Sequence, residues 1–144
     1  MTENRAIVAI RLKVPDNTAF TALVALRRSG VEVARVERAE MWFLDDAGEP
    51  ETLAQRVRAD ESIFNPHLHE VEVRNGSLPR AGEVWIAEAS ASDAPMRVTG
   101  VRKAKRAVSW SLLDSNDAPA SRALLECACK SLLCNAAIEE AAFS

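Results

Sequence analysis

Two histidines and three cysteines are the side chains of this 144-residue chain whose types suggest chemistry. His67 and His69 are two positions apart, so they would share one face of a strand, where a Glu or Cys would have to complete a Zn²⁺ site. No CxxC or HExxH spacing accompanies them. We interpret both as surface imidazoles beside a turn, and the sequence predicts neither a metal nor a cofactor.

The three cysteines lie at positions 127, 129 and 134, and an odd, clustered set does not build a disulfide framework. A nucleophilic cysteine needs a neighbouring histidine or a helix N-terminus, and the sequence places neither beside them. Buried thiols on a helix behave as small apolar side chains. A small enzyme is therefore an alternative only if His67 or a cysteine has a strongly perturbed pKa in a cleft.

The composition describes an ordinary globular protein, with 48% hydrophobic and 27% charged residues. A net charge of −3 argues against a general nucleic-acid-binding protein. We interpret the basic cluster at Arg97 and residues 102–106 as a solvated hairpin tip rather than a local patch for an anion or RNA. No apolar run reaches the ~20 residues of a membrane span, and the polar N-terminus is unlike a signal peptide. We expect a cytoplasmic protein that binds neither nucleic acid nor membranes.

The first elements follow from the spacing of apolar residues. Alternation over residues 6–14 predicts a half-buried strand. A helix follows, capped by Asn17 or Thr18 and stopped by Gly30. Its expected buried side carries Phe20, Leu23, Val24 and Leu26.

The next elements complete a recognisable unit. Residues 31–44 predict two strands joined by a tight turn near Arg38 and Ala39, residues 51–57 predict a helix, and residues 69–73 predict a strand. The order strand, helix, strand, strand, helix, strand is typical of the split βαβ, or ferredoxin-like, unit. We therefore expect an α+β fold with an antiparallel sheet and helices on one face.

The second half repeats parts of the first. Matching residues are Val36 and Val101, Leu44 and Leu113, and Asn65 and Asn135, at separations of 65, 69 and 70 positions. Residues 83–88 predict a strand, residues 96–113 two strands, and residues 124–135 a helix, whereas residues 89–95 are too small and polar to repeat the first helix. The sequence predicts a first copy at 1–74, a linker at 75–82 and a truncated second copy at 83–144.

The second helix, the Asn65–Pro66 break and the acidic strand after it resemble the small subunit of phosphoribosylformylglycinamidine synthase, the PurS family. Residues 7–14 and 34–36 resemble that family's first strand and hairpin, and residues 129–140 are closer still to its helix ending. Residues 38–40 and 103–105 depart from it, since a Gly-Lys turn is expected there. The family is a single short unit, whereas this chain continues beyond it.

The resemblance implies a non-catalytic scaffold subunit of purine biosynthesis. Such a subunit joins the ATP-using synthetase subunit to the glutaminase subunit, so that ammonia from glutamine reaches formylglycinamide ribonucleotide. The catalytic residues would belong to these partners. A paired chain would imitate a dimer of single units, and exposed sheet edges would serve for docking and self-association. The candidate interface residues are Asn65, Pro66, His67, His69, Arg35 and Arg38.

An alternative function is a stand-alone ferredoxin-like module that senses a small molecule or binds another protein. A Gly-rich loop between the first strand and helix would favour ligand sensing, but Pro15, Asp16 and Asn17 occupy that place. Trp42, Trp85 and Trp110 are core residues on apolar strands or anchors of an interface.

Overall fold

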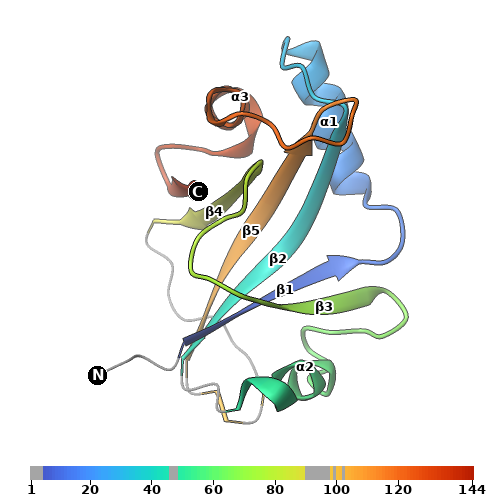
Figure 1. Cartoon of the computed structure of the whole chain (residues 1–144), viewed down its shortest axis with the longest axis vertical. Coiled ribbons are helices and arrows are strands. Elements are labelled where there is room, and N and C mark those ends of the chain that lie inside the picture. The colour runs from blue at the N-terminus through green and yellow to red at the C-terminus, as the bar shows by residue number, and fades with distance from the viewer. Residues whose placement is uncertain (1–4, 46–48, 90–97, 99, 102) are drawn as a thin grey trace. The chain divides into compact units, whose positions relative to one another are not determined.

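A computed structural model describes residues 5–45, 49–89, 98, 100–101 and 103–144 (Figure 1). These residues form an α+β fold with one six-stranded antiparallel sheet, in the order β3-β1-β2-β5-β4-β6, and three α-helices. The strands are β1 Arg5–Leu12, β2 Arg35–Asp45, β3 His69–Arg74, β4 Glu83–Glu88, β5 Lys103–Leu113 and β6 Glu139–Ala142. The helices are α1 Asn17–Arg28, α2 Pro50–Arg58 and α3 Arg122–Ala128, which continues as the π-helical turn η1 Cys129–Leu133. None of the described helices has the length and apolar character needed to cross a membrane.

Packing divides the chain into two compact units. Unit 1 takes the described residues of Met1–Pro15, Ala39–Ser77 and Ala91–Ala107. Unit 2 takes those of Asp16–Arg38, Leu78–Ser90 and Val108–Ser144. Both units draw on residues before and after the expected linker at 75–82, so they are groups of packed residues and do not test the linear division into two copies.

Unit 1 has β1 between β2 and β3, with Val8 opposite Trp42 on one side and Val73 on the other. Helix α2 begins with Pro50 at its first turn and ends with Arg56 and Arg58, which complement the helix dipole. The helix packs against β3, as Figure 1 shows. Its apolar side completes a buried cluster of Val8, Ile10, Trp42, Leu44, Leu53, Val57, Phe64, Val98 and Ala104.

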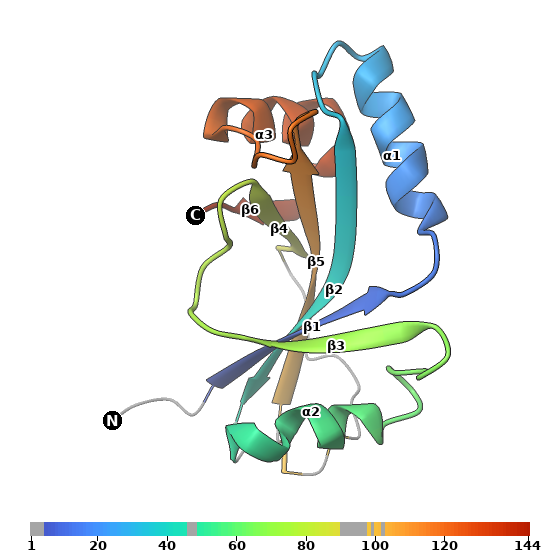
Figure 2. The ribbon, with the colours of Figure 1, turned by 45° about the vertical axis from the view of Figure 1, so that its right-hand side comes forward.

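Unit 2 has β4 between β5 and β6, with α1, α3 and η1 packed around one core (Figure 2). The α1 cap is Asp16, whose carboxylate accepts the Ala19 N–H at 3.1 Å, and not Asn17 or Thr18 as expected. Gly30 ends the helix at a φ of 87°, as predicted. The core contains Ala19, Ala22, Leu26, Val31, Val33, Val36, Val84, Ile86, Leu112, Leu125, Ala128, Cys129 and Leu133.

The expected buried side of α1 is wrong in part. Phe20 is 65% exposed, and Ala19 and Ala22 are buried with Leu26. The small alanines face inward because α1 contacts η1, and small side chains let two helical segments approach closely.

The expected hairpin at Arg38 and Ala39 is also wrong, because β2 is one strand of eleven residues. A two-residue hairpin needs positive φ angles, usually supplied by Gly or Asn, and neither residue type is present there. The described residues between 5 and 74 therefore form three strands, not the four of the expected ferredoxin-like order. The α+β class and the antiparallel sheet are confirmed.

The later elements agree with expectation at some points only. The β4 bounds are those predicted. Two strands were expected within residues 96–113, and the structure has one, β5. Residues 96, 97, 99 and 102 of that range lie outside the described residues. The expected loss of a helix at 89–95 falls almost wholly outside them as well. Strand β6 was not predicted.

Candidate functional site

A hydrogen-bonded turn in unit 1 leads into strand β3. The Asn65 carbonyl accepts the N–H groups of Leu68 at 3.0 Å and His69 at 2.8 Å. The Asn65 side-chain Oδ1 accepts the His67 N–H at 2.9 Å, and the Asn65 N–H donates to Nδ1 of His69 at 2.9 Å. The turn therefore uses both the backbone and the side chain of Asn65.

A turn in unit 2 leads into β6 with the same four bonds. The Asn135 carbonyl accepts the N–H groups of Ile138 at 3.0 Å and Glu139 at 2.7 Å. The Asn135 Oδ1 accepts the Ala137 N–H at 3.1 Å, and the Asn135 N–H donates to Oε1 of Glu139 at 2.8 Å. The acceptor in this turn is therefore the carboxylate of Glu139, whereas in the unit 1 turn it is the imidazole of His69.

Each turn also joins its strand to the neighbouring strand in the same way. The Leu68 carbonyl accepts the Lys13 N–H at 2.8 Å, and the Ile138 carbonyl accepts the Ala89 N–H at 2.8 Å. Leu68 is 41% exposed and Ile138 is 59% exposed. Both turns therefore present an aliphatic side chain to solvent just before an edge strand, β3 or β6, of the described sheet.

Four of the candidate interface residues lie together in the unit 1 turn. Asn65, Pro66 and His67 are exposed, and His69 is half-buried with its ring 5.9 Å from that of Phe64. His67 precedes β3, so the expectation that it shares a strand face with His69 is wrong. Their role in binding a partner stays a prediction.

The turn does not have the arrangement of a metal site. Nδ1 of His69 already accepts a backbone N–H, which leaves only Nε2 of that ring for a ligand bond. Within the described ranges, no three His, Cys, Asp or Glu side chains are grouped so that they would hold a metal ion.

Arg38, the fifth candidate residue, lies in unit 2 and supports α1. Its Nε is 3.1 Å from Oδ2 of Asp16, and the side chains are 26% and 16% exposed. Because Asp16 is also the N-cap of α1, this ion pair joins the start of the helix to strand β2. This contact stabilises the start of α1, and a role of Arg38 in binding a partner stays a prediction.

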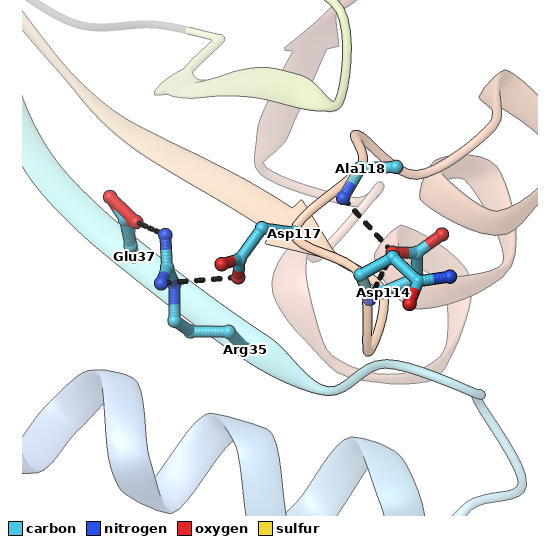
Figure 3. Close-up of polar contacts among 6 residues, drawn as sticks. Arg35, Glu37, Asp114, Asp117 and Ala118 are labelled. Carbon is cyan, nitrogen blue, oxygen red and sulfur yellow. Dashed lines mark hydrogen bonds and ion pairs between the residues drawn. The ribbon is translucent and has the colours of Figure 1, made fainter.

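Arg35, the sixth candidate, forms an exposed ion-pair network, shown in Figure 3. Its guanidinium is 2.7 Å from Glu37 and 3.2 Å from Asp117. Asp117 has a φ of 59° and belongs to the turn after β5, where the Asp114 carboxylate accepts the Ala118 N–H at 2.9 Å. Arg35 therefore contacts both its own strand and this turn.

Cys129 and Cys134 are not activated as nucleophiles. Burial raises the pKa of the Cys129 thiol to about 11, helped by Cys134 and Glu126. Burial and then Glu139 raise the pKa of Cys134. Both thiols stay protonated near neutral pH, and a thiol is a poor nucleophile.

The basic cluster lies on a strand where the structure describes it, and not at a hairpin tip. Lys103, Lys105 and Arg106 are exposed residues of β5. The Arg106 guanidinium lies 5.7 Å from the ring centre of Trp42, a cation–π contact. Arg97 and Arg102 lie outside the described residues.

A groove of about 440 Å³ in unit 2 was not predicted. Side chains of α1, β5 and η1 line it, among them Trp110 and the half-exposed Leu132. The signal in the sequence was a second apolar stripe on the last helix, Leu124, Ala128 and Leu132, beside the stripe that enters the core. The candidate sites are thus the two Asn turns and this groove.

A scan against protein-family models and a search of the curated proteins find no match to the chain.

Proposed function

We propose that this chain is a tandem of two PurS-like units, ferredoxin-like in ancestry, that acts as a cytoplasmic, non-catalytic scaffold subunit of a phosphoribosylformylglycinamidine synthase complex. In this role it joins the synthetase and glutaminase subunits and supports the passage of ammonia between them. The ATP chemistry and the cysteine nucleophile belong to those partners.

The repeated Asn turn is the observation that carries this proposal. Asn65 and Asn135, 70 positions apart, make the same four hydrogen bonds although the acceptor side chains differ. Both turns follow a helix and precede a strand at the end of the sheet order. The resemblance to the PurS family rests on this helix, Asn break and strand, so its recurrence supports a duplicated unit.

The strand pairing within each predicted copy, 1–74 and 83–144, supports the same duplication. Strand β1 lies between β2 and β3 as β4 lies between β5 and β6, and the sheet order is symmetric about its centre. Val8 lies opposite Trp42, and Val84 lies opposite Trp110. A chain with two such copies would present the docking surfaces of a dimer of single-copy subunits.

A scaffold role agrees with the chemistry of the described residues. Cys129 and Cys134 have raised pKa values, and Nδ1 of His69 is engaged by the backbone. The open edges are those of β3 and β6, since each has one neighbouring strand among the described residues. Such edges are places where another chain can add a strand, and they would serve for partners or for self-association.

The test is reconstitution of the complex. The chain is co-expressed with the synthetase and glutaminase subunits from the same source and analysed by size exclusion with glutamine and Mg-ADP. We expect comigration, and loss of glutamine-dependent amidation when the chain is omitted. Elution of the chain alone, with amidation unaffected by its omission, would refute the scaffold function.

A double variant and a control variant test which surface of the chain binds the partner subunits. The double variant Leu68→Glu and Ile138→Glu places charges at both exposed aliphatic positions and should abolish comigration. The control, Phe20→Ser, removes an exposed apolar side chain of α1 and should comigrate as the parent chain does. Equal behaviour of both variants would show that the partners bind elsewhere.

A stand-alone module that binds a small ligand is the second candidate, and the groove in unit 2 favours it. The same size-exclusion experiment separates the two functions, because a ligand-binding module would elute alone and leave amidation unchanged.

A further inference from the structure

The groove between α1, β5 and η1 has a wall built from apolar and small side chains. This wall is formed by Ala22 and Ala25 of α1, Trp110 of β5, and Leu132 and Leu133 of η1. The two alanines leave space that a larger residue would fill. A volume of about 440 Å³ lies in the range of sites for small molecules.

One end of the groove is polar. Asn17, Thr18 and Thr21 lie in the first turns of α1, where their spacing places them on one side of the helix. In the part of the chain that the structure describes, their side chains and the indole N–H of Trp110 make no hydrogen bond. These groups are available to a ligand as donors and acceptors.

Among the residues that the structure describes, those that line the groove carry no ionisable side chain. A charged ligand would lose hydration there without gaining an opposite charge, which is costly. An uncharged ring gains from contact with the apolar wall and with the Trp110 indole. The lining therefore selects ligands by charge as well as by shape.

We propose that this groove binds a small uncharged molecule that carries a ring and one hydrogen-bonding group. The ring lies against Trp110 and Leu133, and the polar group faces Thr18 and Thr21. This inference does not depend on the scaffold function, since it concerns a different surface and a different kind of partner.

The test is a titration of the ¹⁵N-labelled full chain, followed by NMR, with benzamide, indole and cyclohexanecarboxamide. The three tryptophans give three indole N–H signals, and those of the buried Trp42 and Trp85 are internal controls. We expect the Trp110 signal alone to shift, with a Kd of about 1 mM, as small fragments commonly show. Benzoate, which adds a charge to the same ring, should bind at least about tenfold more weakly.

Three variants sharpen the test. Thr21→Val removes a hydroxyl at constant shape and should weaken benzamide binding about two- to tenfold. Ala25→Leu should fill the groove and abolish binding, while Phe20→Ala, on the same helix but outside the groove, should leave it unchanged. Unchanged Trp42 and Trp85 signals establish that each variant is folded.

Several results would overturn the proposal. They are the absence of a selective Trp110 shift with all three fragments, equal binding of benzoate and benzamide, and unchanged binding by a folded Ala25→Leu variant. A Trp110 signal that responds only when a protein partner is added would also overturn it, because the groove would then be a protein-docking surface.

Discussion

The backbone N–H of Asn65 donates to Nδ1 of His69 at 2.9 Å, so the first residue of β3 holds the turn that precedes the strand. In the second turn the same position is taken by Glu139, which accepts from Asn135 at 2.8 Å. An imidazole nitrogen and a carboxylate oxygen are both good acceptors. The position therefore requires an acceptor of suitable reach rather than one residue type.

The first prediction compares the two Asn side chains. Asn65→Ala and Asn135→Ala each remove the side-chain acceptor of one turn, so each should lower the free energy of unfolding by about 1 kcal/mol. Urea unfolding followed by circular dichroism measures both. A loss in one variant and none in the other would show that the turns are not equivalent.

The second prediction concerns the acceptor on the strand. His69→Ala leaves the Asn65 N–H without its partner, so hydrogen exchange at that amide should become about fivefold faster, in line with a bond of about 1 kcal/mol. His69→Glu supplies the acceptor found in the second turn and should preserve protection. Exchange that is equally fast in both variants would contradict the role assigned to His69.

The third prediction follows from the raised pKa of Cys129, about 11 against a usual value of 9.0. The folded chain holds this proton more tightly than the unfolded chain, so the contribution to stability is present below pH 9 and is lost as pH rises toward 11. Urea midpoints of the parent chain should therefore fall across that interval more steeply than those of Cys129→Ala. Parallel profiles would show that the thiol does not titrate this way.

The fourth prediction concerns the start of α1. Asp16→Ala removes both the N-cap and the partner of Arg38, and should cost about 2 kcal/mol, whereas Asp16→Asn keeps the cap and should cost about half of that. The exposed pair of Arg35 is the control, because Arg35→Ala should change stability by less than about 0.5 kcal/mol. Chemical unfolding of the three variants checks the order, and a larger effect of Arg35→Ala would contradict it.

The fifth prediction tests a close backbone approach. Gly82 has a φ of 77°, and a Cβ there would lie 2.7 Å from Cβ of Pro119. Gly82→Ala should therefore destabilise the chain by about 2–3 kcal/mol. Gly76 has a φ of 92° with open space around it, so Gly76→Ala should cost about 1 kcal/mol through its backbone alone. Thermal unfolding of both variants measures the difference, and equal losses would show that Pro119 yields to the added methyl group.

The sequence by itself determined the elements whose information is local. Alternation predicted β1, and a short apolar run predicted β4. The Asn65–Pro66 break predicted where β3 begins, and Gly30 predicted the end of α1. The match of Asn65 with Asn135 predicted a repeat, and each Asn lies in a turn of the structure. An Asn side chain that bonds to its own backbone acts over only a few residues, so this information is local.

Only the tertiary structure decided what depends on distant partners. β2 continues through Arg38 as one strand, β6 forms at the edge of β4, and α1 buries alanines while Phe20 faces solvent. The groove requires residues of α1, β5 and η1 that are far apart in the chain. Periodicity shows that a segment has an apolar side, but strand pairing and burial depend on which surfaces are available to cover it.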